Sequence, residues 1–308
     1  MTVSLFDLHC DTAFRMLTER QPLERNDFAV SLEKANRFER YIQVMALWID
    51  HRRKDSDGWR FFWQMLKNLK SDPSLLEKKV HLTSSCPAPN EHRSLLLSLE
   101  DARILEGDLS RLDQLCEAGI RILTPLWAGV TCIGGAHNTQ EGLTAFGKQA
   151  IARAISLGMI PDVSHASVRS TEEIFSAAEE LHSPVIASHS NAYAVCPVSR
   201  NLRDGQIREV LRLGGLIGLN FYTGFLKEDR SATAASVFEH IDYFLSRGAE
   251  HALALGGDMD GCDLPKDLPD LSALPALAEQ MLSHNYSEQL VRAIFFENAY
   301  AFAQKHLQ

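Results

Sequence analysis

Several features that place a chain in a specialised class are absent from this sequence. It has no run of about 18 apolar residues, so no membrane-spanning helix is expected. It shows no basic segment followed by an apolar stretch near its first residues, so no signal peptide is expected. Its six cysteines include no C-x-x-C pair, which excludes a zinc ribbon and does not suit a small disulfide scaffold. These absences predict a cytoplasmic protein with reduced thiols and no membrane partner.

An excess of positive charge is absent too. The 308 residues carry 31 Lys and Arg against 40 Asp and Glu, a formal net charge of −9. That balance argues against contact with a phosphate backbone, so no nucleic-acid partner is expected. The hydrophobic fraction of 45% and the length are those of a globular chain with a large core, in one α/β domain or two.

The chain does have a regular alternation of short apolar runs and amphipathic helical patterns. The helical patterns at 110–118 and 146–157 run up to Gly119 and Gly158, as helices that end at a C′ glycine do. The capping-box pattern from Ser170 to Glu173 predicts the start of another helix. Alternating strands and helices predict parallel strands joined by helical crossovers. Eight strands are expected, at residues 3–10, 41–49, 94–99, 120–126, 159–164, 184–188, 215–222 and 251–256.

Eight such units predict an α/β fold of the (β/α)8 TIM-like barrel class, distorted, in a single domain over residues 1–308. The stretches 50–93 and 127–145 break the alternation and are interpreted as loop insertions over the C-terminal face of the barrel. An open doubly wound sheet is the alternative. No G-x-G-x-x-G follows the first expected strand, so the usual nucleotide-binding signature of that fold is missing.

Polar side chains that suit metal ions stand at the ends of five expected strands. In a barrel of this kind the active site lies at the C-terminal ends of the strands, so the fold would bring these side chains to one rim. His9 and Asp11 are two residues apart and project to the same side of a strand, while Cys10 between them points away into packing. The set is His9, Asp11, Glu100, His165, His189 and Asp258.

This set contains more ligands than one metal ion needs. Imidazole and carboxylate groups bind Zn²⁺ and related ions, and a catalytic zinc usually takes three protein ligands. The surplus therefore indicates two metals that share a bridging carboxylate and activate water. Each residue alone has an ordinary interpretation, such as a histidine bound to a carbonyl group or Glu100 at a helix N-terminus. The coincidence of six at strand ends favours a metal-dependent hydrolase.

The sequence resembles the renal (membrane) dipeptidase family, within the metal-dependent amidohydrolase superfamily, over nearly the whole chain. The most specific parts are the stretch from His189 to Asn201 and the turn "GGDMDG" at 256–261. The other matching segments are "DLHCDT" at 7–12, "LSLED" at 97–101, "GLTAFGKQAI" at 142–151, "PDVSHAS" at 161–167 and "LIGLNFY" at 216–222.

The resemblance implies a distorted (β/α)8 barrel that holds two zinc ions. His9 and Asp11 match ligands of the first zinc in that family. His165 and His189 match ligands of the second. Glu100 matches the carboxylate that bridges the two ions. The implied cofactor is therefore a pair of Zn²⁺ ions in each subunit.

The resemblance also implies roles outside the metal ligands. Arg200 matches the arginine that binds the C-terminal carboxylate of the substrate, a task that suits a planar guanidinium. Asp258 matches the carboxylate that moves protons. Trp127 stands where the best-known members carry a substrate-binding histidine after the fourth strand, and its indole N–H is a neutral donor. His137, ten residues further on in "GGAHNT", is a second candidate for that task.

The implied activity is hydrolysis of small dipeptides with a free C-terminal carboxylate, through a metal-bridging hydroxide, with D-residues accepted at the C-terminal position. Family members are often dimers, so a homodimer is consistent with the resemblance. Two alternatives stay open. One is a related amidohydrolase that acts on N-acyl-amino acids, lactams or lactones, and the other is a metal-binding pseudoenzyme in which Trp127 reflects lost catalysis. A purely structural role would leave the six strand-end residues unexplained.

Overall fold

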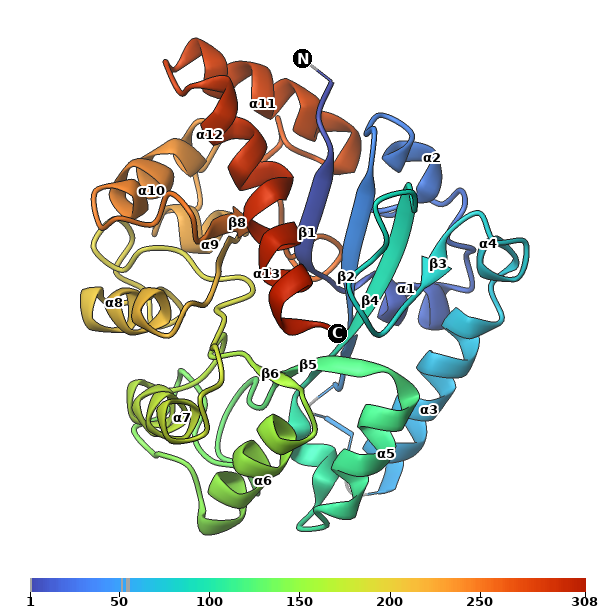
Figure 1. The fold of residues 1–308 in the computed structure, drawn as a ribbon, viewed down its shortest axis with the longest axis vertical. Coiled ribbons are helices and arrows are strands. Elements are labelled where there is room, and N and C mark those ends of the chain that lie inside the picture. Colours follow the sequence, from blue (N-terminus) through green and yellow to red (C-terminus); the bar gives the residue numbers. More distant parts are fainter. Residues whose placement is uncertain (1, 51, 54–55) are drawn as a thin grey trace.

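A curved parallel sheet lies at the centre of the molecule (Figure 1). The computed structural model describes residues 2–50, 52–53 and 56–308. Neighbouring strands follow the order β6-β5-β4-β2-β1-β8-β7, and every pair is parallel. Their bounds are β1 Leu5–Cys10, β2 Tyr41–Trp48, β4 Arg93–Glu100, β5 Ile120–Thr124, β6 Ile160–Pro161, β7 Ile217–Leu219 and β8 Leu253–Leu255.

The segment 184–188 links the two edges of this sheet into a distorted barrel. Isolated parallel bridges join Asp162 to Ile186 on one side and Ala187 to Ile217 on the other. The prediction of a full strand at 184–188 is wrong, because side chains interrupt the ladder there. The amide N–H groups of Ser164 and Ser188 both donate to the Asp162 carboxylate, at 2.9 Å each, instead of to a strand carbonyl. The predicted TIM-like barrel class is otherwise confirmed.

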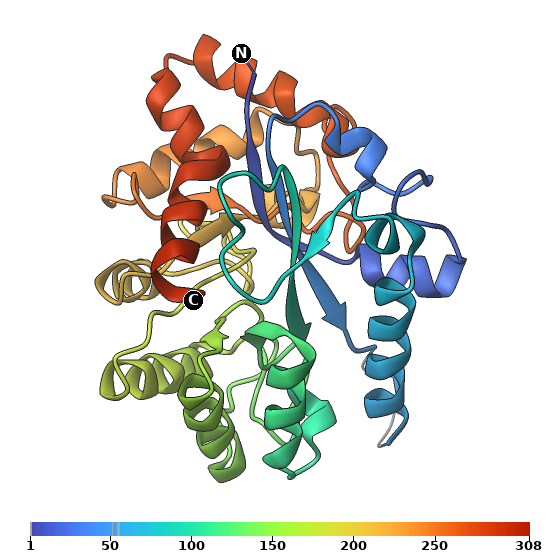
Figure 2. The same cartoon turned by 45° about the vertical axis from the view of Figure 1, so that its right-hand side comes forward.

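Helices surround the ring of strands (Figures 1 and 2). The predicted helix at 110–118 is confirmed as α5, and Gly119 follows it with a φ of 107°. The capping-box prediction places the start of α7 too late, because Ser167 rather than Ser170 is the N-cap, and its side chain accepts from the Ser170 amide. The helices are α1 Thr12–Glu19, α2 Leu32–Ala35, α3 Ser56–Lys70, α4 Pro73–Leu76, η1 Ala102–Leu105, α5 Ser110–Ala118, α6 Ala145–Ser156, α7 Val168–Glu180, α8 Asp204–Arg212, α9 Thr223–Leu226, α10 Ser236–Leu245, η2 Leu271–Ala273, α11 Leu274–Ser283, α12 Glu288–Arg292, η3 Ala293–Glu297 and α13 Asn298–His306.

The two stretches that break the alternation take different places in the fold. The stretch 50–93 contributes α3, which packs against α1 and β2, and a short strand β3, His81–Leu82, which pairs with β4. The stretch 127–145 forms a loop with local antiparallel bridges, and the bridge between Ala136 and Ala166 ties it to the residues that follow β6. The second stretch therefore reaches the C-terminal rim of the barrel.

The core has two parts. The larger part lies between the sheet and the helices, and its apolar side chains come from both. The smaller part fills the barrel interior, where Phe6 and Ile42 from the strands pack with Ala299, Ala303 and Leu307 at the C-terminal end of the chain. Helix α13 thus closes one end of the barrel with small and aliphatic side chains. Among the described residues, no helix combines the length and apolarity needed to cross a membrane.

Candidate active site

The six polar side chains predicted at strand ends do meet at one rim of the barrel. His9 lies in β1 and Glu100 ends β4, while Asp258 comes three residues after β8. Cys10 points away from them as predicted, with its Sγ atom 3.4 Å from the Met45 Sδ atom in the core. The set that the fold brings together is His9, Asp11, Glu100, His165, His189 and Asp258.

His165 and His189 face each other through their Nε2 atoms, which are 2.9 Å apart. The Nδ1 atom of His165 is 3.1 Å from the carbonyl oxygen of Trp127, which can only accept, so Nδ1 carries the proton. The Nδ1 atom of His189 is 2.7 Å from the Oγ atom of Ser188, whose own proton goes to the Asp162 carboxylate. Both Nε2 atoms are thereby left with lone pairs. Two facing lone pairs at this separation fit a cation held between them.

Glu100 places one carboxylate oxygen in each of two groups of side chains. Its Oε1 atom lies 3.0 Å from the Nε2 atom of His165 and 3.6 Å from that of His189. Its Oε2 atom lies 3.5 Å from the Nε2 atom of His9. The side chain is buried, so neither oxygen is satisfied by bulk water. This division suits a carboxylate that bridges two cations.

His9, Asp11 and Asp258 form the second group. The His9 Nε2 atom is 3.5 Å from the Oδ2 atom of Asp11 and 4.0 Å from the Oδ1 atom of Asp258. In the described part of the chain, the His9 Nε2 and Asp11 Oδ1 atoms are buried without a hydrogen-bond partner. Asp11 is the N-cap residue of α1, yet its side chain makes no capping hydrogen bond and turns to the site instead. Buried polar atoms without protein partners fit a cation between these groups.

Burial also sets the electrostatics of the site. It raises the pKa of Glu100 to about 7 and the pKa of Asp258 to about 6. Burial lowers the pKa of His165 and of His189 well below the usual range, which keeps both rings neutral. Burial opposes the charged form of His9 as well, but the nearby carboxylates, Glu100 first, outweigh it and hold the His9 pKa well above its usual value. Several carboxylates are therefore buried close together, and divalent cations bound between them would neutralise their negative charge.

The backbone around the site is tightly constrained. A Cβ atom added at Gly261 would lie 2.0 Å from the Asp11 Oδ2 atom and 2.6 Å from the Asp258 Oδ1 atom, so a side chain at this position would displace both carboxylates. His165 and Asp258 themselves have φ angles of 68° and 56°, in the left-handed region that non-glycine residues seldom adopt. Such strained backbone clusters at functional sites, where the surrounding structure holds it in place.

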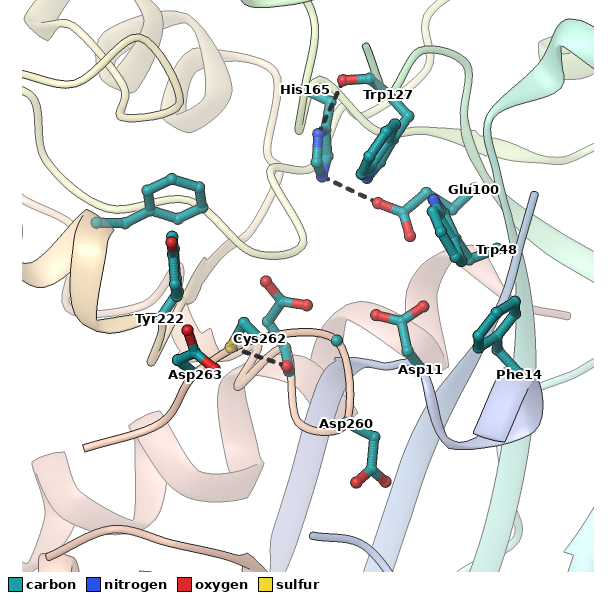
Figure 3. A pocket seen from close by; sticks show the side chains of 13 residues that line it. Asp11, Phe14, Trp48, Glu100, Trp127, His165, Tyr222, Asp260, Cys262 and Asp263 are labelled. Atoms are coloured by element: carbon teal, nitrogen blue, oxygen red, sulfur yellow. Dashed lines mark hydrogen bonds and ion pairs between the residues drawn. The ribbon is translucent and has the colours of Figure 1, made fainter. Parts of the chain in front are cut away.

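A cavity of about 530 Å³ opens over these groups (Figure 3). Asp11, Glu100, His165 and Asp258 line it together with aromatic side chains. Figure 3 shows Phe14, Trp48 and Trp127 on one side and Tyr222 on the other. The Trp48 and Trp127 rings meet edge to face with centroids 5.2 Å apart, which gives that wall a fixed shape. The volume and the mixture of apolar walls with a few polar groups are typical of a small-molecule site.

Arg200 and His137 lie beside a neighbouring cavity of about 350 Å³, and His165 lines both cavities. The Arg200 side chain is buried, and its Nε atom has no hydrogen-bond partner in the described part of the chain. Burial lowers the pKa of Arg200 to about 10, so it remains a cation at neutral pH. The His137 Nδ1 atom is 2.8 Å from Ser199 Oγ, and the His137 ring is 5.9 Å from the His165 ring. Trp127, by contrast, lines the larger cavity.

Three residues that support the site were missed by the sequence analysis. Asn220 donates from its side-chain amide to the Asp258 Oδ2 atom at 3.0 Å. Asp162 and Ser188 orient His189 through the hydrogen bonds described above. Asn220 ends the apolar run "LIGLN" of the seventh predicted strand, so the strand-end pattern that found the metal-binding set could have found it as well.

A family comparison matches almost the entire chain. The model of the membrane dipeptidase family (peptidase family M19) matches residues 1–305. Among curated proteins, Dipeptidase 3 of Macaca fascicularis is 29% identical over 231 residues, which are 71% of this chain and 47% of that protein. The chain therefore spans about half the length of that relative.

Solved structures share the same architecture. Dipeptidase AC, a metallopeptidase, superposes with a TM-score of 0.92 at 25% identity and covers 100% of this chain and 99% of its own. A metallopeptidase from Rhodobacter sphaeroides, solved with a phosphinate mimic of the dipeptide L-Ala-D-Ala, superposes with a TM-score of 0.91 at 24% identity, over 100% of both chains. At this identity the second similarity establishes the fold alone.

Proposed function

Because the chain belongs to the membrane dipeptidase family of metallopeptidases, which act on peptide bonds, we propose that it is a zinc-dependent dipeptidase. The observation that carries the proposal is the position of Glu100 in the lining of the larger cavity. Its two oxygens reach two separate groups of candidate ligands, with His165 and His189 on one side and His9 on the other. One buried carboxylate with this division supports a site for two ions above which a small substrate can lie.

In this proposal two Zn²⁺ ions are held by the side chains that leave polar atoms unsatisfied. His9 and Asp11 would hold one ion, His165 and His189 would hold the other, and Glu100 would be shared between them. The orphaned His9 Nε2 and Asp11 Oδ1 atoms support the first assignment. The facing lone pairs of His165 and His189 support the second. When bound, the ions would lower the pKa of a water molecule and polarise the scissile carbonyl group.

Asp258 is proposed as the group that moves the proton. Its Oδ1 atom faces His9, while its Oδ2 atom is held by Asn220. Its side chain is 13% exposed and lines the larger cavity, so a proton on this carboxylate can pass to a bound substrate. It would take a proton from the attacking water and deliver it to the leaving amine, which completes hydrolysis of the peptide bond.

Arg200 is proposed to bind the free C-terminal carboxylate of the substrate. In the described part of the chain its buried Nε–H group has no acceptor, and its terminal nitrogens donate to neutral oxygens, Ser190 Oγ and the His189 carbonyl oxygen. A carboxylate that entered the neighbouring cavity would satisfy it through charge-assisted hydrogen bonds. Because a longer peptide would carry its carboxylate elsewhere, this contact would restrict the enzyme to dipeptides.

Trp127 and His137 take distinct parts in this proposal. Trp127 forms a wall of the larger cavity and its carbonyl oxygen orients His165, so it shapes the pocket where the family's best-known members have a histidine. The His137 ring lies next to the His165 ring and lines the same cavity as Arg200.

The proposed substrates include dipeptides with a D-residue at the C-terminal position. The L-Ala-D-Ala mimic bound to the Rhodobacter sphaeroides protein supports this part of the proposal. The free state of all six cysteines supports a cytoplasmic location.

The test is a metal and substrate experiment on the purified enzyme. Metal-depleted protein should be inactive and should regain activity as Zn²⁺ is added, with saturation near two ions per chain. A library of L,L- and L,D-dipeptides, with N-acyl-amino acids and lactams beside it, then measures the substrate range. Full activity in the metal-depleted protein would contradict the metal site. Hydrolysis of the acyl-amino acids or lactams without any dipeptide would contradict the substrate assignment.

A further inference from the structure

We propose that Asn220 is a positioning residue that fixes the Asp258 carboxylate for proton transfer, an inference that rests on the proposed function. Asn220 follows β7 by one residue and is fully buried. Its side-chain amide donates to the Asp258 Oδ2 atom at 3.0 Å and to the backbone carbonyl oxygen of His189 at 3.3 Å. It therefore connects the turn after β8, which carries Asp258, with the segment that carries His189.

The direction of this hydrogen bond is determined by the other half of the amide. The Asn220 Oδ1 atom accepts from the backbone N–H of Tyr222 at 2.6 Å. A backbone N–H can only donate, so the oxygen of the amide must face Tyr222 and the NH₂ group must face Asp258. Asn220 therefore presents a donor to Asp258 in its only consistent orientation. A donor stabilises a carboxylate and fixes which of its two oxygens is engaged.

This contact leaves the two oxygens of Asp258 with different tasks. The Oδ2 atom is held by Asn220, while the Oδ1 atom points into the His9 group, 4.0 Å from the His9 Nε2 atom. Gly261 packs against the Oδ1 side, where an added Cβ would lie 2.6 Å away. Asp258 lies beyond the three-residue strand β8 with a positive φ, and its backbone N–H donates to the His9 carbonyl oxygen at 3.2 Å. That bond holds the backbone, and the amide of Asn220 holds the carboxylate of the side chain.

The alternative is that Asn220 only maintains the fold. Its backbone contacts and its side-chain contacts go to different partners, so the two roles can be tested separately. Its backbone N–H and C=O groups pair with the side chain of Asn191, at 3.0 Å and 2.9 Å. These two bonds survive any change of the Asn220 side chain. Substitution of the side chain therefore removes the contacts to Asp258, His189 and Tyr222 while the backbone pairing stays in place.

Two variants of Asn220 remove different subsets of its side-chain contacts. Asn220→Ala removes all three, whereas Asn220→Asp keeps an acceptor for the Tyr222 amide and removes the donor to Asp258. Asn298→Ala serves as the matched control, because Asn298 is also buried and donates to two backbone carbonyls, but at the start of β8, away from the site. Both Asn220 variants should lower kcat about 10-fold to 100-fold with KM within about 3-fold of wild type, as loss of a partner behind a functional carboxylate does. Asn298→Ala should leave kcat unchanged.

A double-mutant cycle distinguishes positioning from general damage. If Asn220 acts through Asp258, then Asn220→Ala should cost little further activity in the Asp258→Asn background. Zinc content should stay at the wild-type value in both Asn220 variants. Additive losses in the cycle, or equal losses of kcat in Asn220→Ala and Asn298→Ala, would overturn the inference.

A crystal structure of zinc-loaded Asn220→Ala tests the same inference without any substrate. The Asp258 carboxylate should turn away from its wild-type position or adopt more than one rotamer. An unmoved, singly ordered Asp258 in the variant would overturn the inference. Failure of the wild-type enzyme to hydrolyse any dipeptide would overturn the proposed function instead, and the position of Asp258 in the variant would still decide the role of Asn220.

Discussion

The two halves of the barrel hold their site residues in different ways. Strands β1, β2 and β4 have six to eight residues each, and His9 and Glu100 stand directly on them. Strands β6, β7 and β8 have only two or three residues, and His165, His189 and Asp258 lie beyond them on irregular backbone. In the first half long strands carry the site residues, with one register shift between Asp7 and Cys10. In the second half the site residues lie outside the strands, and buried polar side chains hold the backbone around them. This difference predicts where substitutions away from the ligands will matter.

The largest effect is expected from the second half, at Asp258. Asp258→Asn removes the group that accepts and donates the proton, so kcat should fall by on the order of 10²-fold to 10⁴-fold. The amide keeps the size of the side chain, so both metal ions should remain bound. Steady-state kinetics together with metal analysis of the same sample measures this. Wild-type turnover in this variant would assign proton transfer to another group.

The next effect concerns Arg200, on the loop that follows His189. Arg200→Ala should lower kcat/KM for free dipeptides about 100-fold, because a buried charge-assisted contact to the substrate carboxylate is lost. Dipeptides with an amidated C-terminus should be poor substrates of both enzymes and show little further loss. Arg208→Ala, on the exposed face of α8, is the control and should behave as wild type. An equal loss for free and amidated dipeptides would contradict the carboxylate contact.

A matched pair of buried carboxylates tests the comparison of the two halves directly. Asp162 accepts from Ser188, which orients the His189 ring, while Asp7 accepts from the backbone N–H groups of His9 and Gly257, where the register of β1 against β2 shifts. Asp162→Asn should weaken zinc binding about 10-fold to 100-fold, since an amide cannot accept at every position that the carboxylate does. Asp7→Asn should weaken it less. Zinc titration of both apoproteins gives the two affinities, and equal losses would show that the halves do not differ.

The smallest effect is expected outside the barrel, at the helix caps. Ser167 caps α7 through the Ser170 amide at 3.0 Å, and Thr144 caps α6 through the Gly147 amide at 2.9 Å. Ser167→Ala and Thr144→Ala should each lower the free energy of unfolding by about 1 kcal/mol. Denaturant unfolding measures this, and kcat should not change in either variant. A loss of kcat in Ser167→Ala alone would mean that the start of α7 supports His165.

The first half of the barrel was also the easier half to predict from sequence. His9 and Glu100 could be placed because their strands are long apolar runs, and a long run fixes both the fold class and the end at which a polar residue stands. Asp11 followed from its spacing to His9. These residues meet as that pattern predicts.

The second half shows where a pattern of apolar runs stops being informative. The run at 184–188 is apolar enough for a strand, but Asp162 binds the Ser188 amide and interrupts the ladder. Side-chain capture of a backbone amide depends on tertiary contacts that periodicity does not record. The capping-box pattern likewise predicts that α7 starts at Ser170, whereas Ser167 is its N-cap. Arg200 lies in no strand or helix, so only the family resemblance indicated it.

The helix that closes the barrel interior has a consequence for synthesis of the chain. Phe6 and Leu8 from the first strand share one cluster with Ala299, Ala303 and Leu307 from the end of the chain. A nascent chain therefore emerges with its first strand long before the residues that cover the inner face of that strand have been made. At translation rates of about 5–20 residues per second, this leaves apolar barrel surface uncovered for many seconds. The barrel interior can be filled only after the segment 299–307 has been synthesised.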